Sequence, residues 1–353
     1  MKHLLSRLAL AGVLTVALAA PAAAQSDILL RLRSGSPLGD RFRVDSASGF
    51  VAKGVLGIGI IPFTGAGERM MWHPNKAAFR AGSIGSAGTQ WDDSNVGYYT
   101  WAGGYNTIAL GLSSFAMGYQ STALGSYSNA LGYTANADGT GAVAIGYRTT
   151  ANADYSVAIG QRASTAGRAG AIVFSDGSTT DSTRATANNQ FTVRAAGGTR
   201  LFTNATMTTG VQLSAGGSSW AVISDRNRKE NFAGVDGEDV LLRLRSVPVT
   251  TWQYRDEEDR STRHIGPMAQ DWHQAFGFTA DGTTINMSDF DGVNLVAVQA
   301  LEARTASQAQ EIQSLRAENA ELRAENAELR AAAARTEERL QRLEALLSPP
   351  AAP

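Results

Sequence analysis

The stretch YNTIALGLSSFAMGYQSTALG, Tyr105–Gly125, decides the fold, because its alanines and glycines repeat every seven residues. Between Asn106 and Ala163, alanine recurs at Ala109, Ala116, Ala123, Ala130, Ala137, Ala144, Ala151 and Ala158. Glycine follows two residues after each alanine, except where Ala153 stands. A coiled helix is excluded because each interior glycine would cost about 1 kcal/mol, and no leucine seam accompanies the repeat. The period predicts short strands stacked into a coil, and several chains around a threefold axis, because one unit cannot bury its apolar face alone.

These units resemble the head repeats of trimeric autotransporter adhesins, over about residues 104–165. The resemblance implies a left-handed parallel β-roll and a homotrimer, with the repeats placed at 106–165. Adhesion follows by analogy only, since a fold does not fix a function. The partner that this analogy suggests is a surface glycan or a cell-surface receptor.

Short strands are also predicted on both sides of the repeats. In the N-terminal β-rich region, 25–105, apolar runs alternate with glycine, as in VLGIGIIPF at Val55–Phe63. The aromatic residues of this region would form a carbohydrate-stacking face or, more commonly, pack in a core or a trimer interface. A β neck is expected at 166–219, with strands at Ala171–Phe174, Gln190–Ala195, Thr199–Thr203 and Gly210–Ser214. Asp176 and Asp181, within this neck, fit turn chemistry.

The stretch WAVISDRNRKENF, Trp220–Phe232, holds the candidate catalytic residues. Ser224 and Lys229 are five residues apart and would not share a helix face. A turn through Asp225–Arg228 would instead fold the lysine back onto the serine hydroxyl. Serine needs a base to become a nucleophile, and a lysine acts as one when burial or nearby positive charge lowers its pKa. The spacing alone favours a solvated turn, because serine and lysine are common and most such pairs are surface residues.

Two further motifs and a coiled coil give this stretch its context. LLRLRSVPVTTWQY, Leu241–Tyr254, and HIGPMAQDW, His264–Trp272, follow it. Together they resemble the intramolecular-chaperone autoprotease domain of phage endosialidases, tailspikes and tail fibres, over about 220–347. The resemblance implies that the domain trimerises, assists folding of the preceding fibre, and then cuts itself off once with a Ser-Lys dyad.

Residue by residue, the resemblance places the catalytic dyad on Ser224 and Lys229. We expect cleavage at Ile223–Ser224, because attack of the serine oxygen on the preceding carbonyl passes through a five-membered ring. Asp225, His264 and Gln270 are the candidate supporting residues, with a structural role for the histidine at least as well supported. The family's usual Gln-Glu pair reads Gln270-Asp271 in this chain.

The predicted chaperone domain, 220–295, is a small α+β domain followed by a coiled coil at 296–347 and a disordered tail at 348–353. Leu315, Leu322, Leu329 and Leu343 lie at seven-residue multiples, and Asn319 and Asn326 occupy companion seam positions. The pattern fits two or three strands, and the resemblance favours three. The expected fold class is therefore a mainly β fibrous trimer with a C-terminal α+β domain that ends in a coiled coil.

Composition and the N-terminus bound the remaining possibilities. Residues 1–24 have the positive start, short apolar stretch and small-residue end of a signal peptide, so we expect export to the cell surface or medium, or to the periplasm. The 31 Lys and Arg balance 32 Asp and Glu, which argues against a nucleic-acid partner. With no cysteine and four unclustered histidines, neither a metal site nor a cofactor is expected.

Two other functions stay open at this point. The chain could be an uncleaved structural or adhesive fibre whose C-terminal domain is a permanent trimerisation cap. It could also degrade glycans, as some phage tailspikes do, although no acid pair is placed for glycoside hydrolysis.

Overall fold

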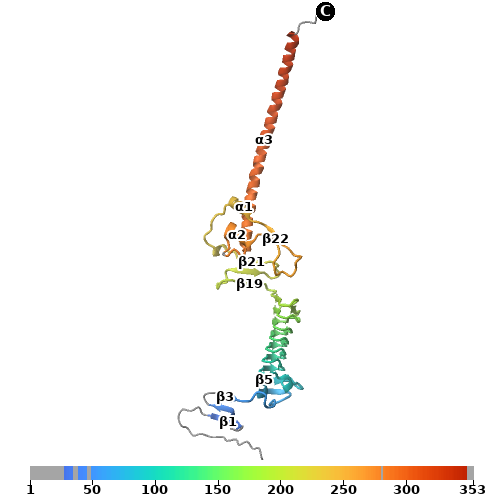
Figure 1. The fold of residues 1–353 in the computed structure, drawn as a ribbon, viewed down its shortest axis with the longest axis vertical. Helices are drawn as coiled ribbons and strands as arrows, with labels where there is room; N and C mark the ends of the chain where they lie inside the picture. Colours follow the sequence, from blue (N-terminus) through green and yellow to red (C-terminus); the bar gives the residue numbers. More distant parts are fainter. Residues whose placement is uncertain (1–27, 35–38, 46–48, 280, 348–353) are drawn as a thin grey trace, which may run out of the picture. The chain divides into compact units, whose positions relative to one another are not determined.

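The computed structural model describes residues 28–34, 39–45, 49–279 and 281–347 (Figure 1). The predicted signal peptide and the predicted tail lie outside these residues. The chain divides into two units, with the first running to Thr203 and including Gly210–Ala221, and the second comprising Asn204–Thr209 and the residues from Val222 onward. Across the described ranges, none of the helices is both long and apolar enough to span a membrane.

The repeats form a β-solenoid, coloured teal to green in Figure 1, with two parallel sheets. The longer sheet contains β6 Trp101–Tyr105, β8 Phe115–Tyr119, β10 Asn129–Tyr133, β12 Val143–Tyr147, β14 Val157–Gln161, β16 Ile172–Ser175 and β18 Phe191–Arg194. The shorter sheet contains β7 Ile108–Ala109, β9 Thr122–Ala123, β11 Asn136–Ala137, β13 Thr150–Ala151, β15 Ala163–Ser164 and β17 Thr183–Arg184. Ala116 pairs with Ala130, 14 residues on, so two seven-residue units make one turn. The predicted coil of stacked short strands is confirmed.

Alanine and glycine have different roles in each turn. The repeat alanines are completely buried and form one continuous core, too narrow for larger side chains. Gly132 has φ +134°, and a Cβ there would lie 2.0 Å from the carbonyl oxygen of Gly146 in the next turn. Gly125 has no positive φ, yet its Cβ would lie 1.9 Å from the Gly139 oxygen. The glycines are thus required where neighbouring turns touch backbone to backbone.

The longer sheet continues beyond the repeats at both ends. On the N-terminal side, β5 Ala78–Ile84 pairs parallel with β6, and β4 Gly67–His73 pairs antiparallel with β5. On the other side, the strands expected at Ala171–Phe174 and Gln190–Ala195 appear as β16 and β18 of the solenoid.

A buried arginine fills the core at the first turn of the solenoid. Arg80 is fully buried, and its Nη2 donates to Thr100 Oγ1 at 2.9 Å and to the Ala109 carbonyl at 3.0 Å. Burial lowers the pKa of Arg80 to about 10, so the side chain is still charged at neutral pH. Arg80 thereby adds side-chain hydrogen bonds to carbonyls that also accept from backbone N–H groups, and these bonds satisfy the buried donors on its Nη1 and Nη2.

The prediction of a strand at Val55–Phe63 is wrong, because these residues form turns and bends. Gly57 and Gly59 adopt φ +77° and +104°, which breaks an extended path. Asn75 holds the resulting loop, since its carbonyl accepts from Gly57 N at 2.8 Å and its Nδ2 donates to the Gly59 carbonyl at 3.0 Å. Three strands of this region, β1 Ile28–Ser34, β2 Gly39–Asp45 and β3 Gly49–Ala52, form an antiparallel sheet of their own. Two more, β4 and β5, belong to the longer sheet of the solenoid.

A small sheet follows the solenoid. The two neck strands predicted at Thr199–Thr203 and Gly210–Ser214 are present as β19 Thr199–Phe202 and β20 Gly210–Leu213. They pair antiparallel. β21 Ala221–Val222 is the third strand of this sheet and lies within the candidate catalytic stretch, just before Ile223 and Ser224.

The second unit is a small α+β domain. It contains α1 Gly237–Ser246, β22 Thr250–Trp252, β23 His264–Gly266, α2 Ala269–Phe276 and α3 Met287–Leu347. Its core comprises Val240, Val247, Trp272, Val293 and Ala297. α2 was not anticipated, and α3 begins nine residues before the coiled coil expected at 296–347.

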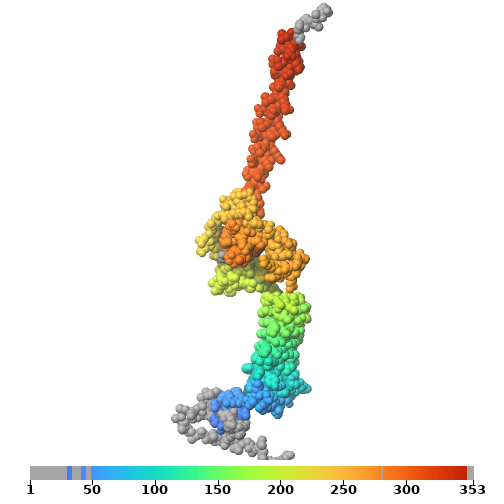
Figure 2. All heavy atoms as spheres, in the orientation of Figure 1, coloured from blue at the N-terminus to red at the C-terminus, as the bar shows by residue number. Residues whose placement is uncertain are grey.

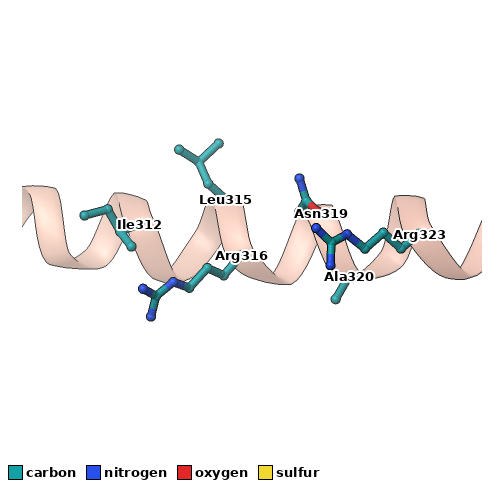
Figure 3. Close-up of a pocket in the computed structure, with 6 residues that line it drawn as sticks. All are labelled: Ile312, Leu315, Arg316, Asn319, Ala320 and Arg323. Carbon is teal, nitrogen blue, oxygen red and sulfur yellow. The ribbon is translucent and has the colours of Figure 1, made fainter.

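Beyond the core, α3 carries its apolar seam in solvent. All residues from Leu301 to Leu347 are exposed, and Figure 2 shows this part of the helix as a bare rod. Leu315 and Asn319 project from the same side of the helix, opposite Arg316 (Figure 3). A shallow hollow at this level is lined only by α3 itself, by residues such as Ile312 and Arg323. A single chain therefore leaves the predicted leucine seam uncovered.

Candidate self-cleavage site

Ser224 and Lys229 lie side by side at the start of the second unit. Lys229 Nζ donates to Ser224 Oγ at 2.6 Å. The residues between them form a 3-10 turn, Arg226–Arg228, closed by a hydrogen bond of 3.1 Å from Arg228 N to the Asp225 carbonyl and one of 3.2 Å from Lys229 N to the Arg226 carbonyl. The compact turn expected from the sequence thus places the lysine on the serine hydroxyl.

Asp225 shapes this turn as its N-cap. Its Oδ1 accepts from the backbone N of Asn227 at 2.9 Å and from Asn227 Nδ2 at 3.1 Å. Its Oδ2 lies 3.6 Å from Arg228 Nε. The carboxylate is therefore engaged with the turn that joins Ser224 to Lys229.

The surroundings of the pair are open in the single chain. Ser224 and Lys229 are exposed, whereas Ile223, whose carbonyl precedes the serine, is half-buried. The Arg226 guanidinium lies over the Phe232 ring, 5.3 Å from its centroid, and Arg228 is near Asp225. Of the two arginines in this turn, Arg228 is thus partly balanced by the Asp225 carboxylate.

His264 and Gln270 lie elsewhere in the domain. His264 is paired with Trp252 across β22 and β23, and its ring lies 4.7 Å from the Trp252 ring, centroid to centroid. Gln270 is exposed in the first turn of α2. Among the residues that the structure describes, no hydrogen bond joins either of them to the dyad.

The partner of His264 was not anticipated. Its Nε2 lies 3.1 Å from Glu257 Oε1, within the DEED loop that joins β22 to β23. The four acidic residues of this run, Asp256–Asp259, lie in the loop between the two strands. Sequence alone did not show that one of these carboxylates turns back onto the strand.

The Asp176 carboxylate has structural partners, whereas Asp181 takes part through its backbone carbonyl, which accepts from Arg194 Nη1 at 2.7 Å. Asp176 Oδ1 accepts from Ser178 Oγ at 2.7 Å and from Arg194 Nε at 3.0 Å, and its Oδ2 accepts from Ala196 N at 2.5 Å. These hydrogen bonds, with that from Ser178 the strongest, hold the pKa of Asp176 well below its usual range. Within the described ranges, no three His, Cys, Asp or Glu side chains form a group that could hold a metal ion.

Comparison with known proteins gives two family matches. Residues 224–281 match the family model described as chaperone of endosialidase, and the match begins at Ser224 itself. Overlapping copies of the YadA head domain repeat match residues 102–163, which form the solenoid. No curated protein and no solved structure gave a significant match. The chain is thus a tail-fibre-like or adhesin-like protein in which YadA head repeats precede a chaperone-of-endosialidase domain.

Proposed function

We propose that this chain is an exported homotrimeric fibre protein whose C-terminal domain assists trimer folding and then cuts the chain at Ile223–Ser224. The observation that carries the proposal is the hydrogen bond between Lys229 and Ser224 at the first residue of the chaperone match. A cut at that peptide bond would separate the chaperone domain from everything before it.

The chemistry needs only the two side chains and water. Unprotonated Lys229 takes the hydroxyl proton of Ser224, and Oγ attacks the Ile223 carbonyl carbon through a five-membered ring. The C–N bond then breaks, and the ammonium of Lys229 returns the proton to the leaving amine. Water hydrolyses the resulting ester to a carboxylate on Ile223 and a free hydroxyl on Ser224. Each chain reacts once, so no turnover of other substrates is expected.

Association would make the lysine a better base. Ser224 and Lys229 are exposed in the single chain, and burial disfavours the charged form of a lysine. The exposed seam of α3 supplies a reason to associate, with Leu315, Leu322 and Leu329 each about half exposed. Seam asparagines such as Asn319 would fix the register of the helices. Cleavage would then follow assembly.

The cut has a kinetic use. Removing the domain that aligned the chains leaves interlocked solenoids unable to unfold by the reverse of their assembly route. Export is supported by the pattern of residues 1–24, and an adhesin-type head suits a protein at the cell surface.

Intact mass after denaturation tests the cut. We would compare wild type with Ser224→Ala and Lys229→Ala, and use Ser219→Ala as a matched control outside the turn. Wild type and the control should give two fragments that meet at Ile223–Ser224, while both dyad variants stay whole. Fragments from the Lys229→Ala chain, or a junction elsewhere, would overturn the dyad.

The exposure of the dyad favours one alternative, an uncleaved fibre with a permanent C-terminal cap. In that case all four chains remain full length and still associate. Sedimentation of the same samples separates this result from a failure to assemble.

A further inference from the structure

One corner of the solenoid carries an aromatic residue at every second turn. Successive turns place the following residues at this corner, all with positive φ: Tyr99, Ser113, Tyr127, Gly141 and Tyr155. Each of the last four donates its backbone N to the residue that precedes the equivalent corner one turn earlier, such as Tyr127 N to the Leu112 carbonyl at 2.7 Å. Tyrosine therefore alternates with a small residue along one column.

The rings of this column are accessible to solvent. Tyr99, Tyr127 and Tyr155 are 52%, 57% and 71% exposed. A Cβ added at Gly141 would lie 3.2 Å from Cδ1 of Tyr155, so this ring lies over the small residue of the preceding turn. Two strand spacings separate successive tyrosines, about 9.6 Å.

A second tyrosine column on the same solenoid differs in this respect. Its rings stack face to face, with centroids about one strand spacing apart, in the order Tyr105, Tyr119, Tyr133 and Tyr147. Their neighbours cover their faces and leave mainly edges in solvent. In the two-turn column a small residue stands between each pair of tyrosines, so among the described residues no such stacking joins Tyr99, Tyr127 and Tyr155. Tyr99 makes only a tilted contact with Tyr98, with 6.3 Å between the ring centroids.

Bulky residues are unfavourable at this corner. A tyrosine at φ near +60° is strained, and glycine adopts the same conformation without cost. The chain itself has Gly141 at an equivalent place. Local folding therefore does not require the tyrosines, and burial within the chain does not explain them either.

We propose that Tyr99, Tyr127 and Tyr155 form a binding platform for an extended β-1,4-linked glycan. The C–H face of a pyranose ring stacks on an aromatic ring, and in such a glycan successive sugars are flipped. The same sugar face thus recurs once per disaccharide, a length that matches the two-turn spacing of the tyrosines. Ser126 and Asp154 directly precede two of these tyrosines in the chain, and their side chains would bind sugar hydroxyls. Asp154 Oδ1 already accepts from Thr140 N at 2.8 Å, which leaves its Oδ2 for this role. The proposal deepens the adhesive part of the proposed function and does not depend on self-cleavage.

Isothermal titration calorimetry of the full chain with cellohexaose and N-acetylchitohexaose tests the platform, with α-linked maltohexaose for comparison. The variant Tyr99→Ser/Tyr127→Ser/Tyr155→Ser replaces each tyrosine with serine, which the column already has at Ser113. The matched control is Tyr147→Gln, which removes a stacked tyrosine and substitutes the residue found one turn later, Gln161. Each chain is also prepared with Ser224→Ala, so that loss of cleavage and loss of glycan binding are scored separately.

We expect a β-linked hexasaccharide to bind wild type and the control within about twofold of each other. The triple variant should bind at least about tenfold more weakly than wild type. Its melting temperature should equal that of wild type. Absence of binding to both β-linked sugars, equal binding by the triple variant, or equal loss in Tyr147→Gln would each overturn the platform. A changed sedimentation coefficient in the triple variant would show that the tyrosine column contacts another copy of the chain. That result would also overturn the glycan platform.

Discussion

Lys229 Nζ lies 2.6 Å from Ser224 Oγ across a single 3-10 turn that Asp225 caps. The two reactive atoms are thus brought together by local structure, within six residues of sequence. Small changes in the cap should therefore affect cleavage without changing either reacting side chain.

Asp225→Ala should slow self-cleavage about fivefold, because loss of an N-cap typically costs about 1 kcal/mol and loosens the turn. Asp225→Asn should cleave nearly as fast as wild type, since asparagine caps equally well. Denaturing electrophoresis measures the fraction of cleaved chain at successive times after protein synthesis begins. Equal slowing by both substitutions would indicate that the charge of Asp225, rather than its cap, matters.

Lys229→Arg should leave the chain whole although it keeps the positive charge. Arginine stays protonated in proteins and does not accept the serine proton. If Lys229 only held the turn by its charge, the arginine variant would still cleave. Intact mass after prolonged incubation distinguishes these results.

Gly132→Ala should destabilise the solenoid by roughly 3 kcal/mol, because the site combines a positive φ with backbone contact. The new Cβ would lie 2.0 Å from the Gly146 carbonyl oxygen. Gly197→Ala is the matched control, since no atom lies within 4 Å of a Cβ there. Thermal unfolding followed by circular dichroism should show a lower midpoint for the first variant only, and equal midpoints would contradict the packing argument.

The solenoid could be predicted because its information is local and repeated. Each alanine and glycine faces the same environment as its equivalent 14 residues away, so a single interpretation holds for every turn. The dyad turn was predictable for a similar reason, since its partners are five residues apart. Val55–Phe63 was misread because its apolar residues match a strand in composition, while two glycines with positive φ break the path.

Features that depend on distant partners could not be predicted. Arg80 fills the core through Thr100 and Ala109, which lie 20 and 29 residues away. His264 meets Glu257 only because β22 and β23 form a hairpin. These contacts depend on tertiary packing, which no periodicity or spacing in the chain encodes.

Asp176→Asn should reduce the acid sensitivity of the last solenoid turn. Since hydrogen bonds depress the folded pKa of Asp176, its carboxylate contributes stability above the unfolded pKa of about 3.9, and this contribution is lost as pH falls through the folded value. The melting midpoint of wild type should therefore fall more than that of the variant between about pH 7 and about pH 2.5. Asp181→Asn, which keeps the backbone carbonyl that Arg194 contacts, should behave like wild type.

Leu315→Asp/Leu322→Asp should abolish self-association and, with it, self-cleavage. Both leucines lie in the exposed seam of α3, and a carboxylate at a packed seam position is not tolerated. Ala317→Asp/Ala324→Asp, two residues further on in each heptad and on the outer face of the helix, is the control and should still associate. Sedimentation velocity gives the state of association, and the fraction of cut chain is measured in the same samples. Because the dyad turn is built entirely from neighbouring residues, a monomeric variant that still cleaved would show that the turn alone is sufficient and that burial by partner chains is not required for the reaction.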